Sequence, residues 1–65
     1  MKIGDTVKVY QKPLTYEDYE GEAVVRRILF QRKEGNGVIF RAVVNFPEDG
    51  PHTVVERTIA EGKVV

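Results

Sequence analysis

The sequence predicts an all-β fold, a small barrel of five strands with a short 3₁₀ turn before the last strand. The main observation is the segment 37–46, in which apolar and mixed positions alternate, as in a strand with one buried face. The apolar face consists of five residues: Val38, Phe40, Ala42, Val44 and Phe46. Turns rich in glycine and proline separate this segment from other β-branched runs. We expect it to be the central strand of one domain, residues 1–65, because a chain this short leaves no room for a second domain.

Two strands are expected ahead of the central one. In residues 1–10, Val7 and Val9 alternate with polar residues, so both valines should point into the core. Residues 11–20 are expected to form a long irregular loop. Residues 22–31 carry apolar residues on both faces, a pattern that also fits helical spacing, but β-branched and aromatic residues favour a strand. We therefore expect a second strand here that bends between the two sides of the barrel.

The rest of the chain is expected to complete the barrel. Residues 31–36 form a charged loop whose glycines suit a hairpin reversal, and residues 47–51 form a tight turn bounded by prolines. Residues 52–59 have the composition of a fourth strand. Residues 60–62 predict the 3₁₀ turn. Residues 63–65 are expected to be the last strand, which closes the barrel against the first.

The hairpin between the central and the fourth strand has a preferred register. On the outer face Arg41 is expected opposite Glu56, and Val43 opposite Val54, so that opposite charges meet and apolar groups meet. A slip of one residue would place Arg41 across from Arg57. The same register pairs inner-face residues as Val38 with Ile59, Ala42 with Val55, and Val44 with Thr53.

Composition narrows the class of protein. Ten basic and ten acidic residues give a net charge of zero, which argues against general binding of polyanions. The charge is unevenly placed: residues 15–22 hold four acidic and no basic residues, whereas residues 26–41 hold five basic residues and one acidic residue. The chain has no cysteine, so we expect no disulfide and no thiolate metal site, and we expect a reducing cytoplasm. We expect neither a signal peptide nor a membrane span.

Catalysis is not expected from this composition. Cysteine and serine are both absent, and none of the four threonines has a candidate base beside it in the sequence. The one histidine, His52, follows Glu48 and Asp49 at a turn, and a single imidazole with two turn carboxylates is a poor set of metal ligands. We therefore expect no enzyme, no cofactor and no bound metal ion.

The order of the expected elements is strand, long loop, long bent strand, charged loop, strand, tight turn, strand, 3₁₀ turn and short strand. This layout resembles the SH3-like small barrels. Over residues 3–28, the run Gly4-Asp5-x-Val7-x-Val9, followed by Glu20-Gly21-Glu22-Ala23-Val24 and Ile28, is similar to the KOW motif. Barrels with that motif occur in ribosomal proteins and transcription elongation factors, so the resemblance implies contact with RNA. In SH3-like folds the ligand commonly binds between the first two loops, here residues 11–20 and 31–36.

The leading hypothesis is a non-enzymatic module that binds a protein partner through the groove between residues 11–20 and 31–36. All three tyrosines of the chain lie in or beside the first of these loops. Tyrosine combines a flat apolar ring with a polar hydroxyl and is enriched at interfaces. The expected protein-binding residues are Tyr10, Tyr16, Glu17 and Tyr19. Alternatively, Tyr10 or Tyr19 folds down to cap the end of the barrel.

Two other functions are open at this point. A nucleic-acid accessory protein would contact phosphates through four basic residues: Arg26, Arg27, Arg32 and Lys33. The alternative for these side chains is ion pairing with the acidic first loop. A structural subunit of a larger assembly, or a homo-oligomer, would use the half-apolar outer face with Ile39, Val43 and Val54. In solution we expect a monomer or a weak homo-oligomer.

Overall fold

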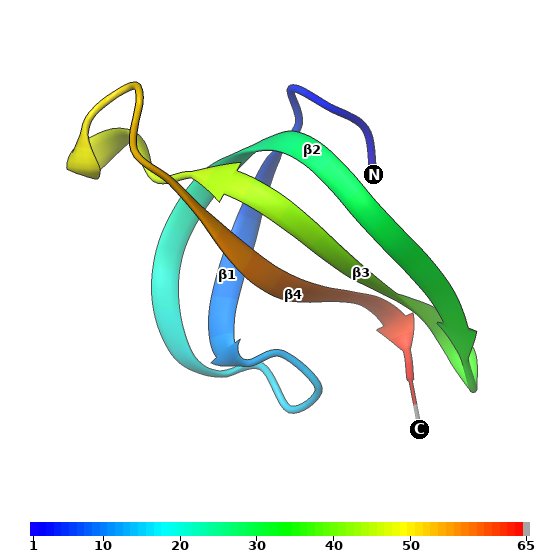
Figure 1. Ribbon diagram of the computed structural model, residues 1–65. Coiled ribbons are helices and arrows are strands. Elements are labelled where there is room, and N and C mark those ends of the chain that lie inside the picture. Colours follow the sequence, from blue (N-terminus) through cyan, green and yellow to red (C-terminus); the bar gives the residue numbers. More distant parts are fainter. Residues whose placement is uncertain (65) are drawn as a thin grey trace.

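The computed structural model describes residues 1–64 and shows an all-β fold of four antiparallel strands (Figure 1). The strands are β1 (Thr6–Lys12), β2 (Glu17–Glu34), β3 (Asn36–Asn45) and β4 (Val54–Lys63). Each strand pairs with the next one along the chain, and the sheet curls into a half-barrel. One turn of 3₁₀ helix, η1 (Pro47–Asp49), lies between β3 and β4. No helix within the described residues is long and apolar enough to cross a membrane.

The core lies on the concave inner face of the sheet. Its buried members come from all four strands: Val9, Ala23, Val25, Phe40, Ala42, Val44 and Ile59. In β3 the predicted alternation is confirmed, because Phe40 and Val44 are buried while Val38 and Phe46 pack against the cluster from its ends. The outer face carries the alternate residues: Arg27, Phe30 and Arg32 of β2, Ile39, Arg41 and Val43 of β3, and Glu56 and Thr58 of β4.

β2 is the bent strand that the sequence predicts, and it is longer than expected at both ends. Its pairing with β3 skips Arg26 and Leu29, so each of these residues forms a bulge. A bulge reverses the face on which the following residues point, which explains why apolar residues occupy both faces of this run. Phe30, which follows the second bulge, points outward and is 58% exposed. The expected loop 11–20 is mostly strand, because β1 and β2 leave only residues 13–16 between them.

The predicted fifth strand is not confirmed. Residues 60–62 do not form a 3₁₀ turn but continue β4, which ends at Lys63. The expected last strand, residues 63–65, therefore begins inside β4, and Val65 lies outside the described residues. The physical reason is a close pairing of Gly37 with Gly62. A Cβ on Gly37 would lie 2.5 Å from the carbonyl oxygen of Glu61, so only glycine lets the two backbones approach and the ladder continue.

The register of the β3–β4 hairpin is shifted by two residues from the predicted one. Arg41 lies opposite Thr58, Val43 opposite Glu56. The cause is Asn45, which is buried and donates hydrogen bonds from Nδ2 to the carbonyl oxygens of Gly50 and Thr53, both at 2.7 Å. These bonds hold a wide loop, residues 46–53, in place of a tight turn. A shift of two keeps every side chain on its predicted face. The predicted Arg41–Glu56 contact therefore survives as a diagonal ion pair of 3.4 Å.

The half-barrel does not close through its backbone. Its two edge strands, β1 and β4, are not paired with each other in the described part of the chain. They face each other along a line that we call the seam, where residues 7–10 approach residues 59–61 and border an open hollow of about 320 Å³. Side chains cross the seam instead. Arg57 reaches Glu20, the hydroxyl of Tyr16 donates to the carbonyl oxygen of Ala60 at 3.3 Å, and the amino group of Met1 lies 3.9 Å from Glu61.

Candidate functional site

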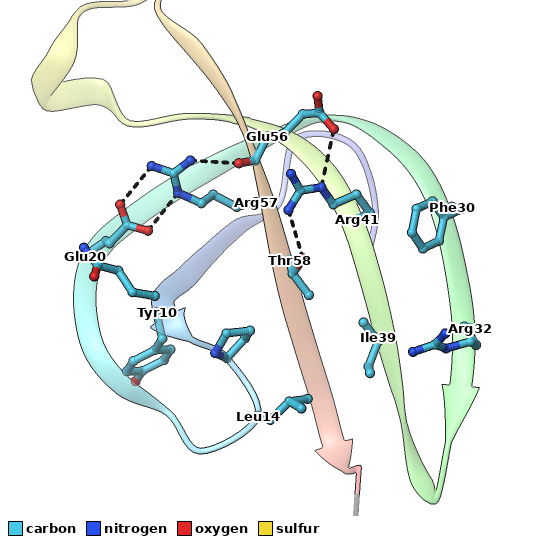
Figure 2. Close-up of a pocket in the computed structure, with 12 residues that line it drawn as sticks. Tyr10, Leu14, Glu20, Phe30, Arg32, Ile39, Arg41, Glu56, Arg57 and Thr58 are labelled. Atoms are coloured by element: carbon cyan, nitrogen blue, oxygen red, sulfur yellow. Dashed lines mark hydrogen bonds and ion pairs between the residues drawn. The ribbon is translucent and has the colours of Figure 1, made fainter.

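A groove of about 670 Å³ lies beside β4 and continues onto the outer face of the sheet. One side is formed by the end of β1 and the following turn, with Tyr10, Pro13 and Leu14. The other side is formed by β4 and the outer face. Figure 2 shows these side chains around β4. Leu14 lies near the lower end of the strand, and Arg57 extends from the strand toward Glu20 at the left of the view. Because Leu14 is 51% exposed, the groove has an apolar side chain open to solvent.

One end of the groove is fixed by a bidentate ion pair. Arg57 donates from Nε and Nη2 to the two carboxylate oxygens of Glu20, at 2.8 and 3.0 Å. The hydrogen bond to Glu20 raises the pKa of Arg57 above its ordinary value. Arg57 also donates from Nη1 to the carbonyl oxygen of Glu56 at 2.8 Å, and its guanidinium lies 5.9 Å from the centre of the Phe46 ring. This arginine is therefore fully engaged within the chain and is a structural element of the groove.

The outer-face part of the groove has a different character. Arg41 contacts Glu56 through Nε and donates from Nη1 to the Thr58 hydroxyl at 3.0 Å. Among residues 1–64, Arg32 makes a single ion pair, 3.2 Å between its Nε and Glu34, and its side chain is 66% exposed. Phe30 lies next to these arginines, since it pairs with Arg41 across the β2–β3 ladder. The groove therefore offers an exposed aromatic ring beside a guanidinium that retains free donors.

The three tyrosines form one cluster at the turn between β1 and β2. The ring of Tyr10 lies 5.4 Å from that of Tyr16, edge to face, and 5.3 Å from that of Tyr19. Tyr10 is half-buried and lines the groove, whereas Tyr16 and Tyr19 are about half exposed. Tyr19 lies instead at a second concavity, beside Phe46. Of the predicted protein-binding residues, the structure thus brings the tyrosines together but places only Tyr10 in the groove.

The remaining predicted binding residue, Glu17, lies at the start of β2 opposite Lys12 and is exposed. It does not line the groove. Tyr16 has a backbone φ of 55°, an unusual conformation for a bulky residue. Its hydroxyl bond to Ala60 and its packing on Tyr10 hold it there. Such conformations often mark functional positions, so Tyr16 is of interest even though it lies at the seam.

The four predicted basic residues do not form one cluster. Arg26 lies in a bulge and donates to the carbonyl oxygen of Pro51 at 3.4 Å. Arg27 and Arg32 share the outer face with Phe30, whereas Lys33 pairs with Val38 and belongs to the opposite side of the sheet. Within the described residues none of the four pairs with the acidic segment 15–22; the partner of Glu20 is Arg57. Of the predicted outer-face apolar residues, Ile39 and Val43 are half-buried and Val54 is exposed.

The sequence interpretation did not name most residues of the groove as candidate binding residues, among them Leu14, Phe30, Arg57 and Thr58. One signal was present for Arg57, because it lies between Val55 and Ile59 at positions that point inward. A charged residue at such a position requires a partner. No comparable signal marked Phe30, since residues 22–31 carry apolar side chains at almost every position and the sequence does not show where the bulges of β2 lie.

Metal chemistry finds little support in the geometry. His52 is exposed, and no group of three histidine, aspartate or glutamate side chains in residues 1–64 is arranged to hold a metal ion.

Comparisons with family models, with curated proteins and with solved structures find no match for this chain. The fold defines its class as a small all-β domain, a curled antiparallel half-barrel of four strands.

Proposed function

We propose that the chain is a non-enzymatic interaction module, an SH3-like barrel that binds a protein partner in the cytoplasm. The groove beside β4 is the binding site. The single observation that carries this proposal is the groove itself, about 670 Å³, which mixes exposed apolar side chains with anchored charges. Leu14 and Phe30, both more than half exposed, line the groove and give it apolar surface that a partner could cover. The fixed Arg57–Glu20 pair gives the groove a rigid end.

The tyrosine cluster supports the same conclusion. Tyr10 forms part of the groove wall and is packed between Tyr16 and Tyr19, so its ring is held in one orientation. A pre-ordered aromatic ring loses little conformational entropy when a partner binds. We therefore expect Tyr10 to contribute directly, and Tyr16 and Tyr19 to contribute by positioning it.

The experiment is a peptide selection followed by mapping. Peptides of twelve residues are selected from a random phage-displayed library on the wild-type domain and then titrated into ¹⁵N-labelled protein. We expect amide shifts at residues 10–12, at Leu14 and at residues 56–58. Leu14→Asp should weaken binding at least about tenfold, because it places a charge in the apolar wall. The matched control is Ile3→Asp, which changes another exposed apolar residue, one that does not line the groove. Failure to select any peptide that shifts the groove residues would refute the proposal.

A second candidate function, nucleic-acid accessory binding of KOW type, is favoured by one observation. Arg27, Phe30 and Arg32 lie on the same face of β2, and Phe30 is exposed. Bases of single-stranded RNA stack on exposed aromatic rings while arginines hold the phosphates. The test is fluorescence anisotropy with labelled oligo-uridine at about 50 mM salt, where this kind of binding is strongest. Binding that is lost in Phe30→Ala and declines steeply with salt would replace the protein-partner proposal.

A further inference from the structure

The free edge of β4 faces the groove with its backbone. β4 pairs with β3 on one side only. In an antiparallel ladder every second residue directs its N–H and C=O away from the partner strand. Two side-chain contacts identify these residues in β4: the carbonyl oxygen of Ala60 accepts from Tyr16, and that of Glu56 accepts from Arg57. Glu56, Thr58 and Ala60 therefore point their backbone groups outward.

Thr58 lies between the two occupied carbonyls. Its side chain takes a hydrogen bond from Arg41 on the outer face. No side chain among residues 1–64 reaches its backbone N–H or C=O, and the residue lines the groove. An outward N–H and C=O on one residue are the two groups that an added antiparallel strand uses. Edge strands usually carry features that prevent such pairing. In β4 the contacts of Tyr16 and Arg57 occupy the carbonyl groups on either side of Thr58 but leave those of Thr58 itself accessible.

The surroundings of Thr58 indicate what kind of chain would fit. Side chains of an added strand alternate between two sides. One set would meet the apolar wall of Pro13 and Leu14, and the other would lie on the outer face, where Arg41 of β3 pairs with Thr58 and Arg32 of β2 lies one strand further away. Three arginines and two glutamates line the groove, so its charge is one unit positive, and the side chain of Arg32 is the most exposed of these five. Apolar residues on one side and carboxylates on the other satisfy both surfaces.

We infer that the protein binds its partner by strand addition: an extended peptide segment, with apolar and acidic residues in alternation, pairs with β4 at Thr58. This inference rests on the proposed function and specifies how the same groove recognises its ligand. The added strand would occupy the free edge that the predicted fifth strand does not cover. Arg57 and Tyr16 limit the pairing at each end, so the register of the peptide is fixed by the chain itself.

The test uses an array of synthetic octapeptides in which apolar residues alternate with aspartate, serine or lysine. Binding is measured by fluorescence polarisation with wild-type protein and two variants. Thr58→Pro removes the outward N–H, a place where an edge strand tolerates proline. Thr58→Ala is the matched control, because both variants lose the hydroxyl that accepts from Arg41. We expect the aspartate series to bind most tightly, and Thr58→Pro to bind about five- to tenfold more weakly than Thr58→Ala, from which it differs in lacking the backbone N–H.

A second measurement keeps the inference testable if Thr58→Pro does not fold. Each backbone amide of the best octapeptide is N-methylated in turn. Strand addition requires that every second N-methyl group abolishes binding while the others have little effect. Peptides that bind with a dependence on Leu14 but without this alternation, and equally to a folded Thr58→Pro, would overturn strand addition and leave the proposed function standing.

Two other results would be equally decisive. Absence of binding to every octapeptide and to the selected library peptides would overturn the proposed function together with this inference. Concentration-dependent dimerisation of the wild type that Thr58→Pro abolishes would show that a second copy of the chain occupies the edge, which also contradicts the inference. Sedimentation velocity of the wild type and of both variants separates these cases.

Discussion

The β3–β4 ladder and the β1–β4 seam join the same sheet in two different ways. The ladder joins Asn36–Asn45 to Val54–Lys63 along the whole length of both strands through backbone hydrogen bonds. Across the seam the described residues show three side-chain contacts: Arg57 with Glu20, Tyr16 with Ala60, and Met1 with Glu61. The ladder therefore sets the fold, whereas the seam determines whether the edge of β4 is covered.

The ladder and the seam are expected to differ in their resistance to opening. Backbone ladders form and break cooperatively with the core, whereas partly exposed side-chain contacts contribute little each and open locally. The seam is therefore the place where this domain should open first. It is also the place that borders the groove, so local opening and ligand binding concern the same residues.

The largest expected effect is in the ladder, at Gly37. Gly37→Ala places a Cβ 2.5 Å from the carbonyl oxygen of Glu61, which forces β3 and β4 apart. We expect a loss of about 2–3 kcal/mol in the free energy of unfolding, measured by urea denaturation. Gly4→Ala is the control, since no heavy atom lies near its Cβ and only its positive φ of 95° is strained. We expect Gly4→Ala to lose about 1 kcal/mol from backbone strain alone. If Gly37→Ala loses no more than Gly4→Ala, the steric explanation is wrong.

The next effect is expected at Asn45, which sets the end of the ladder. Asn45→Ala leaves the carbonyl oxygens of Gly50 and Thr53 without their donors beneath the loop. We expect a loss of about 2 kcal/mol, because two hydrogen bonds of a buried amide are lost, each contributing about 1 kcal/mol. Asn36→Ala, at an exposed position of the same strand, should change stability by less than about 0.5 kcal/mol. Equal effects at the two sites would show that Asn45 does not organise the loop.

Asn45 also shows how much of the fold the sequence could predict. Alternation along β3 correctly predicted which side chains point inward, because burial acts on every second residue. It could not distinguish registers that differ by two, since both keep each side chain on the same face. The choice depended on the hydrogen bonds of one buried amide to a loop, which no periodic pattern encodes.

The candidate site was less predictable than the fold for a related reason. The tyrosine cluster follows from local sequence, and the three rings do meet. The basic residues of β2 are near neighbours in sequence, yet the bulge at Leu29 sends Arg27 and Lys33 to opposite sides. Arg57 and Glu20 are far apart in the sequence and meet only because the sheet curls. Contacts that depend on curvature and bulges cannot be read from spacing alone.

The third prediction concerns the strongest contact of the seam. A double-mutant cycle with Glu20→Ala and Arg57→Ala should give a coupling energy of about 1 kcal/mol, since the pair is bidentate and Glu20 is only 17% exposed. The parallel cycle at Arg41 and Glu56, joined by one longer contact on the outer face, should give about 0.3 kcal/mol. If the Arg41–Glu56 pair gives the same coupling energy as the Glu20–Arg57 pair, the bidentate contact at the seam is no stronger than an ordinary surface ion pair.

The same cycle has a defined pH dependence. The hydrogen bond to Glu20 raises the pKa of Arg57. A raised pKa adds stability that is complete below the pKa of the unfolded chain and is lost only as the pH rises through the pKa of the folded protein. Both values lie in the strongly alkaline range, so the coupling should not change between about pH 7 and about pH 10. A decline across that interval would mean that another group controls the pair.

The smallest expected effect is at the other contact of the seam. Tyr16→Phe removes the hydroxyl that donates to Ala60 and should cost about 0.5 kcal/mol, because the bond is long and partly exposed. The clearer measurement is amide hydrogen exchange at residues 59–61, which should become faster while the core amides of β3 stay protected.

Tyr19→Phe is the matched control, since its hydroxyl has no hydrogen-bond partner among the described residues. If both variants exchange alike, ring packing on Tyr10 rather than the hydroxyl keeps this end of the seam closed. If only Tyr16→Phe opens, the freed carbonyl of Ala60 lengthens the exposed edge of β4, and peptides that pair at Thr58 should then bind more tightly.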